Sequence, residues 1–69
     1  MSVGENIKKF RLAKNLTQEE LAKAVGVSGP MITQLERGTK TPNLLLGKDI
    51  AKALNCSLED LLDNEKEAG

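Results

Sequence analysis

The side chains that most often carry out enzyme chemistry are scarce in this chain of 69 residues. The sequence contains no histidine and a single cysteine, Cys56. Without histidine it lacks the usual general base, and one cysteine forms neither an internal disulfide nor an ordinary zinc site. No acidic pair in a plausible pocket and no glycine-rich phosphate loop after a strand can be recognised. The sequence therefore predicts a protein that is not an enzyme and that uses no metal or cofactor.

Two short helices joined by a tight turn are predicted for residues 17–38, which read TQEELAKAVGVSGPMITQLERG. Thr17 and Ser28 are good N-caps for these two helices. Gly26 and Gly38 follow their last residues, and glycine tolerates the left-handed backbone that a sharp helix end requires. Two helices separated by a glycine-containing turn of about four residues make a helix-turn-helix, whose second helix can lie in the major groove of DNA.

The rest of the chain supplies the helices that must support this pair. Further helices are predicted over roughly residues 3–14 and 44–54, and Ser57 caps a short fifth helix. The segment 39–43 between the third and fourth helices is polar and contains proline, so it predicts an exposed loop. We therefore expect residues 1–62 to form one all-α domain, a compact five-helix bundle.

Helical spacing of the apolar residues predicts which side chains face the interior. The expected inward residues are Ile7, Phe10, one of Leu12 and Ala13, Leu21, Ala24, Val25, Val27, Met31, Ile32, Leu35, Leu44, Ile50, Ala51 and Leu54. Cys56 is expected to be a buried small hydrophobe, with a redox-sensing thiol as the alternative. Gly47 weakens the fourth helix by up to ~1 kcal/mol relative to alanine, and it marks either a close backbone approach or an irregular first turn.

The net charge of the chain is zero, but its charges are unevenly distributed. Residues 1–58 contain nine Lys and Arg against five acids, whereas residues 59–69 contain five acids and one lysine. A mildly basic body is compatible with DNA binding but does not demand it. We expect the acidic tail, residues 63–69, to be disordered. No apolar run approaches the ~18 residues of a membrane span, and no signal-peptide core precedes the first helix, so a cytoplasmic protein is expected.

Three runs of sequence carry a resemblance to a known family. They are LTQEELAKAVGVS followed by ITQLERG, then the dipeptide TP, and then IAKALNCSLEDLL. Together they resemble the phage repressor and Cro (XRE-type) family of helix-turn-helix DNA-binding domains over roughly residues 5–62. The resemblance implies a lambda-repressor-like fold whose third helix enters the major groove of double-stranded DNA. It also implies a homodimeric transcriptional regulator, with repression favoured, that acts on a pseudo-palindromic operator and has no small-molecule substrate.

The resemblance further implies which residues contact the DNA backbone. Gln18 is the expected phosphate clamp, because it begins the second helix, where unpaired backbone N–H groups also favour an anion. Ser28 is expected to cap the third helix and to donate to a phosphate. The remaining expected phosphate contacts are Arg37, Lys40, Thr41 and Asn43. Such contacts fix the register of a protein on DNA but carry little sequence information. The alternative for each is an ordinary solvated side chain.

Base-reading residues are expected on the exposed side of the third helix. Gln34 can bond N6 and N7 of adenine, Thr33 offers a hydroxyl and a methyl group, and Met31 can touch a thymine methyl or be buried. Relatives often place long polar side chains in the first turn of this helix, where the present chain has Gly29 and Pro30. Gly29 is expected instead to let the backbone come very close to a phosphate or a base.

Two further groups are expected to act through the structure. The family pattern pairs Arg11 on the first helix with Glu36 near the end of the third, and the alternative is two unpaired surface charges. In the fifth helix, Leu58, Leu61 and Leu62 cannot all face the core of so small a domain. We expect one of them to lie exposed and this group to supply a homodimer contact, the alternative being a fully internal cluster.

A second function is compatible with the same fold. It is a protein-interaction module with weak DNA binding, which acts as an antitoxin-like partner or as a regulator of another repressor. The neutral charge and the Gly29–Pro30 turn favour this module. Gln18, Gln34 and the basic body of the chain favour the DNA-binding regulator instead.

Overall fold

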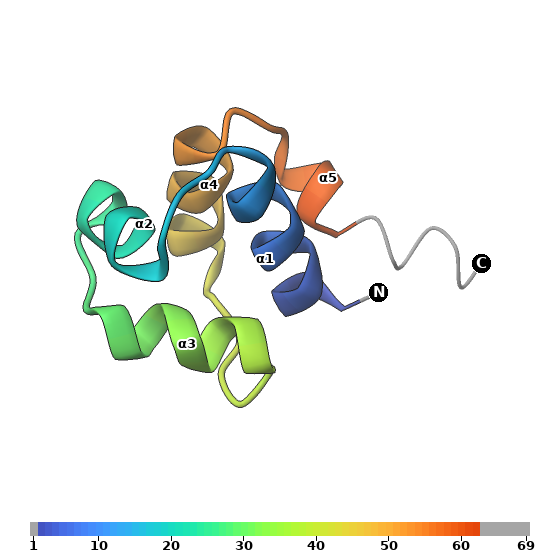
Figure 1. Ribbon diagram of the computed structural model, residues 1–69. Coiled ribbons are helices and arrows are strands. Elements are labelled where there is room, and N and C mark those ends of the chain that lie inside the picture. The colour runs from blue at the N-terminus through green and yellow to red at the C-terminus, as the bar shows by residue number, and fades with distance from the viewer. Residues whose placement is uncertain (1, 63–69) are drawn as a thin grey trace.

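The fold is described by a computed structural model for residues 2–62, which form five helices and no strand. The helices are α1 (Val3–Ala13), α2 (Gln18–Val25), α3 (Gly29–Arg37), α4 (Leu44–Ala53) and α5 (Leu58–Leu61), as Figure 1 shows. The predicted all-α, five-helix architecture is confirmed over this part of the chain. The prediction of a disordered acidic tail concerns residues 63–69, which lie outside the described residues.

Each helix begins at a polar side chain that accepts a hydrogen bond from a backbone N–H of its first turn. These N-caps are Ser2, Thr17, Ser28, Asn43 and Ser57. A side-chain oxygen at this position satisfies one of the backbone donors that a helix start leaves unpaired. The helices α2 and α3 end at Gly26 and Gly38, whose φ angles are 77° and 86°. The tight turn of the helix-turn-helix is therefore set by local residue chemistry.

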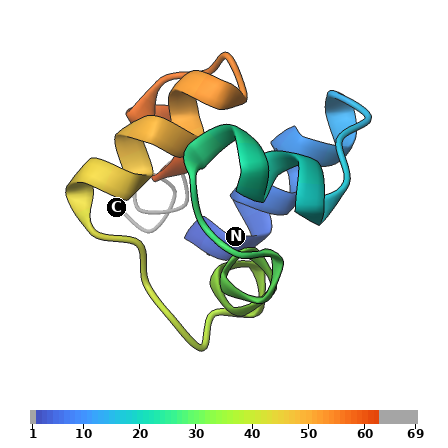
Figure 2. The same cartoon turned by 90° about the vertical axis from the view of Figure 1, so that its left-hand side faces the viewer.

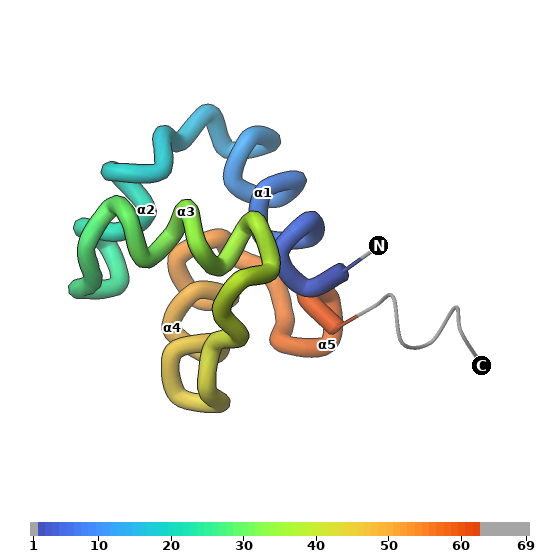
Figure 3. Tube along the Cα trace, turned by 90° about the horizontal axis from the view of Figure 1, so that it is seen from below, coloured from blue at the N-terminus to red at the C-terminus, as the bar shows by residue number. Residues whose placement is uncertain are grey.

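The helix α3 lies along one side of the molecule. It runs across the bottom of Figure 1 and crosses in front of the other helices in Figure 3, which is viewed from below. It packs against α1 and α2, while α4 packs against α2 and α5. Figure 2 shows α3 end-on, with the loop to α4 beside it. No other part of the described chain covers the outer side of α3, so that side is available to a partner.

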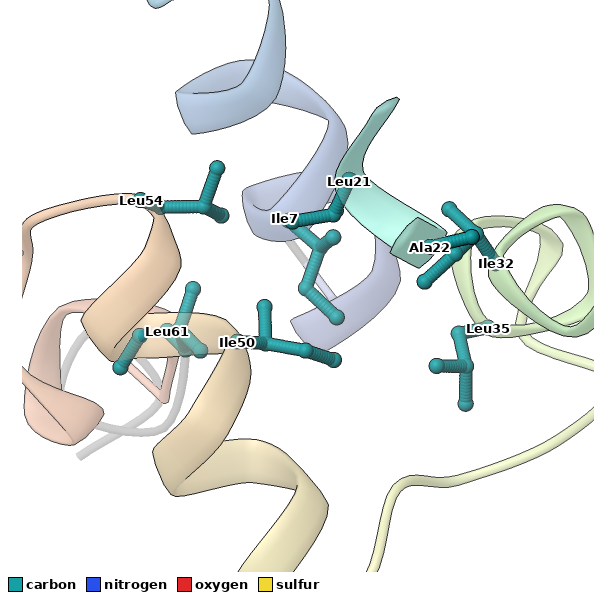
Figure 4. Packing of buried hydrophobic residues seen from close by; sticks show 9 residues of the cluster. Ile7, Leu21, Ala22, Ile32, Leu35, Ile50, Leu54 and Leu61 are labelled. Atoms are coloured by element: carbon teal, nitrogen blue, oxygen red, sulfur yellow. The ribbon is translucent and has the colours of Figure 1, made fainter. Parts of the chain in front are cut away.

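The core holds α3 in place through two of its side chains, Ile32 and Leu35, which are fully buried. They join a single apolar cluster to which all five helices contribute, and Figure 4 shows this packing. The other large side chains buried in it are Ile7, Leu21, Ile50, Leu54 and Leu61. Burying one such side chain stabilises a fold by roughly 1.5–3 kcal/mol before the entropy of folding is counted. The position of α3 is therefore set by the core of the domain.

Three of the inward predictions are wrong: Ala24, Leu44, and the choice between Leu12 and Ala13, neither of which is buried. Ala24 and Ala13 are exposed, and Leu12 and Leu44 expose 54% and 68% of their surface. On α2 the inward stripe includes Ala22, which lies two residues before the predicted Ala24 and so on the opposite side of the helix. Leu44 is the first residue of α4 and falls outside the stripe of that helix, whose buried members are Gly47, Ile50 and Ala51. The apolar spacing gave the right helices, but the direction of the stripe depends on the neighbouring helices.

Two close contacts between helices were not predicted. A Cβ atom added to Gly4 would collide with the backbone carbonyl of Leu35 and lie 2.7 Å from that of Glu36, so α1 and α3 touch almost backbone to backbone. The buried side chain of Asn6 donates to the carbonyl of Leu61 at 2.8 Å and ties α1 to α5. Gly47 was predicted to mark either a close approach or an irregular turn, and its Cβ would lie 3.3 Å from a methyl group of Leu58.

Candidate nucleic-acid interface

The outer face of α3 carries polar and charged side chains at helical spacing. Pro30, Gln34 and Arg37 are exposed and lie four and three residues apart, which places them on one side of the helix. The opposite side is formed by the buried Ile32 and Leu35. A long amide and a guanidinium therefore project from a helix that the core holds in place, which is a geometry suited to contacts with a groove of DNA.

A buried ion pair locks the end of α3 against α1. The Nε atom of Arg11 donates to Oε2 of Glu36 at 2.6 Å, and its Nη2 donates to Oε1 at 3.2 Å. These side chains are only 8% and 4% exposed. A third donor, Nη1 of Arg11, bonds the carbonyl of Leu16 at 2.7 Å in the connection to α2. The structure therefore brings these two predicted residues together, and the alternative of two unpaired surface charges is wrong.

Gln18 joins the same network from the start of α2. Its Nε2 donates to Oε1 of Glu36 at 3.0 Å, and its Oε1 accepts a hydrogen bond from the hydroxyl of Thr33 at 2.8 Å. A side-chain amide has two N–H donors. The second N–H of Gln18 bonds no other group in the part of the chain that the structure describes. The expected phosphate clamp is thus held where the start of α2 packs against α3, and one N–H of its amide remains unused within the described residues.

Two expected DNA contacts of α3 are engaged within the protein. The hydroxyl of Thr33 has a single proton, which it donates inward to Gln18, with the carbonyl of Gly29 a longer 3.4 Å away. Met31 is half-buried and packs against the core, in line with the alternative of burial. Ser28 accepts a hydrogen bond from the backbone N–H of Met31 at 3.3 Å, as its predicted capping role requires. Its hydroxyl proton remains a possible donor.

The loop after α3 folds back onto the end of that helix. The hydroxyl of Thr39 donates to the carbonyl of Gln34 at 3.2 Å, and the backbone N–H of Lys40 donates to the same carbonyl at 3.3 Å. Lys40 and Thr41 are exposed, so their side chains continue the polar surface from Arg37. The described contacts fix the backbone of this loop and leave the side chain of Lys40 in solvent.

Two expected contacts have a more specific structural setting. Asn43 caps α4, because its Oδ1 accepts a hydrogen bond from the backbone N–H of Leu46 at 2.8 Å. Its amide N–H groups remain possible donors to a phosphate. A Cβ atom on Gly29 would meet only the Cγ of Glu19, at an ordinary 3.5 Å. Packing within the protein therefore gives no reason for glycine at this first position of α3.

The leucines expected at a dimer contact are placed differently from one another. Leu61 is only 1% exposed and belongs to the core, so the expectation that it supplies a dimer contact is wrong. Leu58 and Leu62 are half-buried. The two most exposed leucines lie instead on α4, where Leu44 and Leu45 expose 68% and 73% of their surface. The side chain of Asn6 donates to the backbone carbonyl of Leu61, so α5 is joined to α1 at this residue.

An apolar groove of about 250 Å³ lies between the start of α1, the start of α4, and α5. Val3, Pro42, Leu44, Gly47, Leu58 and Leu62 contribute to its lining. Beside it, Leu45 and Leu58 border a second groove that includes Lys48 and Lys52. Leucines from α4 and α5 thus form one apolar surface that is separate from the outer face of α3.

Cys56 lies at the edge of the core and is half-buried. Burial raises the pKa of its thiol above the usual value, and the nearby carboxylate of Asp60 raises this pKa further. At neutral pH the side chain is therefore a protonated thiol, the less reactive form.

None of the helices in residues 2–62 is long and apolar enough to cross a membrane.

Comparison with known proteins gives a consistent result across sequence and structure. A helix-turn-helix family profile matches residues 7–61. An uncharacterized helix-turn-helix-type transcriptional regulator of Archaeoglobus fulgidus is 46% identical over 61 residues, which cover 88% of this chain and 86% of that protein. The uncharacterized regulator YazB of Bacillus subtilis is 40% identical over 63 residues, or 91% of each chain. The crystal structure of the P22 c2 repressor in complex with a synthetic operator superposes with a TM-score of 0.84, at 38% identity, and covers 88% of this chain and 92% of that one.

Proposed function

Because the chain belongs to the phage repressor and Cro family of helix-turn-helix transcriptional regulators, we propose that it binds double-stranded DNA as a homodimer and represses transcription. The observation that carries the proposal is the outer face of α3. There Gln34 and Arg37 project into solvent from a helix that the core and the buried ion pair hold rigidly. The proposed place of action is the cytoplasm.

The proposed phosphate contacts surround this face of α3. At the N-terminal end of α3 the donor is the hydroxyl proton of Ser28, and alongside the helix it is the second N–H of Gln18, whose amide bonds Thr33 and Glu36. At the other end, the donors are the side chains of Arg37, Lys40, Thr41 and Asn43. Backbone contacts at both ends of a recognition helix fix its position and tilt in the groove. Binding through phosphates also releases counterions, so its affinity falls steeply with salt.

Base reading is proposed to depend mainly on Gln34. Its exposed amide can bond N6 and N7 of one adenine, a contact worth about 1–3 kcal/mol of discrimination against a wrong base. Gly29 offers close backbone approach, Met31 offers a methyl group, and Thr33 offers a methyl group and a hydroxyl whose proton is already donated to Gln18. With few base contacts, the affinity for an operator is expected to exceed that for random DNA only modestly.

The proposed homodimer contact is the apolar surface formed by Leu44, Leu45, Leu58 and Leu62. We choose a second copy of the chain as its occupant because the charges that flank the leucines are complementary to one another. Exposed Lys48, Asp49 and Lys52 lie on the α4 side, which leaves that side one net positive charge. Exposed Glu59 lies on the α5 side. A two-fold axis would place the basic flank of each copy against the acidic flank of the other, as self-complementary interfaces require.

The proposal is tested by titrating the protein with a random duplex and with the best duplex recovered from a random pool, each at two salt concentrations. A DNA-binding regulator should bind both and lose affinity steeply with salt.

Gln34→Ala should weaken the selected duplex more than the random one, since it removes a base contact. Arg37→Ala should weaken both alike and lower the salt slope by roughly one ion. Equal losses for Gln34→Ala on the two duplexes would contradict its role as a base reader.

A protein-interaction module is the second candidate function, and the exposure of Leu44 and Leu45 favours it. Apolar side chains exposed side by side are typical of surfaces that bind another protein. This candidate predicts that no duplex is retained at ~50 mM salt, where electrostatic binding to DNA is strong. The same titration therefore distinguishes the two functions.

A further inference from the structure

We propose that Thr33 is a positioning residue of the phosphate clamp, and that it does not read bases. Its hydroxyl holds the amide of Gln18 so that one N–H of that amide faces an incoming DNA phosphate. The inference rests on the proposed DNA binding and adds to it a role for a residue that sequence reasoning assigned to base contact.

The first step is the orientation of the Gln18 amide. Its Nε2 lies 3.0 Å from Oε1 of Glu36, whose carboxylate accepts hydrogen bonds and donates none. Turning the amide over would place its oxygen against that buried negative charge. The carboxylate of Glu36 therefore orients the nitrogen of the Gln18 amide toward the ion pair. The amide oxygen then faces Thr33 and accepts a hydrogen bond from its hydroxyl at 2.8 Å.

The second step is the rotation of the side chain. A glutamine has three side-chain torsions, and freezing them on binding would reduce affinity. With one end of the amide bonded to Glu36 and the other to Thr33, its plane is fixed before DNA arrives. Of the two groups that bond the Gln18 amide, only the hydroxyl of Thr33 can be removed without disturbing the buried ion pair. Thr33 is therefore the residue whose substitution tests the positioning of Gln18.

The third step is what Thr33 has left for DNA. The residue is half-buried, and its single hydroxyl proton is used within the protein. A base contact in which this hydroxyl donates would require the bond to Gln18 to break first. The position also differs from that of Gln34, its neighbour in sequence, which is exposed on the outer face of α3.

The test compares Thr33→Val, which keeps the shape but lacks the hydroxyl, with Thr33→Ser, which keeps the hydroxyl but lacks one methyl group. Binding is measured by fluorescence anisotropy on a random duplex and on the best duplex from a random pool. Thr33→Val should weaken both duplexes by the same factor, about three- to tenfold, the range expected for one neutral hydrogen bond. Thr33→Ser should bind like the wild type. The thermal unfolding midpoint of each variant is measured alongside, so that a loss of fold is recognised.

A double-mutant cycle with Gln18→Ala separates positioning from any direct contact. In the Gln18→Ala background, Thr33→Val should cost no further affinity, because the side chain that it positions is gone. In the free protein, the side-chain amide protons of Gln18 should shift in the NMR spectrum of Thr33→Val.

Three results would overturn the inference while leaving DNA binding intact. They are a larger loss on the selected duplex than on the random one, additive losses in the double-mutant cycle, and an unchanged amide spectrum of Gln18. A wild-type protein that retains no duplex at all would instead overturn the proposed function, and this inference with it.

Discussion

At the scale of single residues, the charges that matter most are the two that are hidden. Glu36 accepts three hydrogen bonds, two from Arg11 and one from Gln18. A third donor of Arg11, Nη1, bonds the carbonyl of Leu16. A buried pair satisfied in this way contributes little net stability compared with an apolar pair, but removing one member strands the other. The network therefore makes the position of α3 sensitive to either charge.

Replacing Glu36 with glutamine should unfold much of the protein. The change leaves the buried guanidinium of Arg11 without a counter-charge, which costs about 3–5 kcal/mol. A core of this size supplies only about 3–5 kcal/mol in total. Urea denaturation followed by circular dichroism measures the loss, with Glu19→Gln on the exposed side of α2 as the matched control. A variant that unfolds at the same urea concentration as the control would show that the pair is not structurally important.

Gly29→Ala should separate folding from DNA binding. Alanine fits the 3.5 Å space beside Glu19 and suits a helix better than glycine, so the free energy of unfolding should stay the same or rise by about 0.4–1 kcal/mol. If the backbone at this position approaches DNA closely, the added methyl group should weaken duplex binding by about fivefold or more, from an overpacking cost of about 1 kcal/mol. Binding that is unchanged in a fully folded Gly29→Ala protein would remove this residue from the interface.

The limits of sequence reasoning at this scale are clearest for Thr33 and for the ion pair. The Arg11–Glu36 pair was expected from the family pattern, because both its partners stand at matching positions. Thr33 lies on the boundary between the buried and exposed stripes of α3, so helical spacing cannot decide where its hydroxyl points. That direction depends on Gln18, 15 residues away in sequence.

At the scale of helices, the starting points were predictable and the packing directions were only partly so. Thr17, Ser28 and Ser57 were identified as caps, because capping depends on residues within one turn. Which side of a helix is buried depends on neighbours that are distant in sequence. Ala24 and Leu44 were placed on the wrong side for this reason. The close approach of α1 and α3 at Gly4 left no signal in the apolar spacing.

Gly4→Ala should destabilise the contact between α1 and α3. The new Cβ would collide with the carbonyl of Leu35, and backbone atoms cannot move aside as a flexible side chain can. We expect the free energy of unfolding to fall by about 1–3 kcal/mol, the usual cost of overpacking. Gly47→Ala is the matched control, since its Cβ would meet only a methyl group of Leu58 at 3.3 Å. Equal unfolding midpoints for the two variants would show that α1 and α3 separate freely.

At the scale of the whole molecule, the protein presents two separate surfaces. One is the outer face of α3 with the loop that follows it, and the other is the leucine surface of α4 and α5. The sequence predicted a leucine contact at α5, but it could not show that Leu61 turns inward while Leu44 and Leu45 stay exposed. That arrangement results from the packing of α5 against α1 and α4.

Leu44→Asp should convert the proposed dimer to a monomer without unfolding it. The side chain is 68% exposed, so its loss should change the free energy of unfolding by no more than about 0.5 kcal/mol. A carboxylate at the first position of α4 also suits the positive end of that helix. Sedimentation equilibrium measures the oligomeric state. Leu12→Asp, on an exposed leucine of α1 outside the leucine surface, should remain dimeric.

The geometry of a dimer on DNA yields the last prediction. Two recognition helices related by a two-fold axis bind half-sites one helical turn apart, roughly 34 Å or 10–10.5 base pairs. Adding about five base pairs between the half-sites turns them to opposite faces of the duplex. The wild type should then bind this duplex no better than it binds a single half-site. Adding a full turn leaves both half-sites on one face of the duplex, so both remain accessible to the dimer. Leu44→Asp, as a monomer, should bind the duplexes with the original spacing, the half-turn insertion and the full-turn insertion equally in the same anisotropy titration. A wild-type protein that is indifferent to the half-turn insertion would show that it binds DNA as a monomer, and the leucine surface would then belong to a different partner.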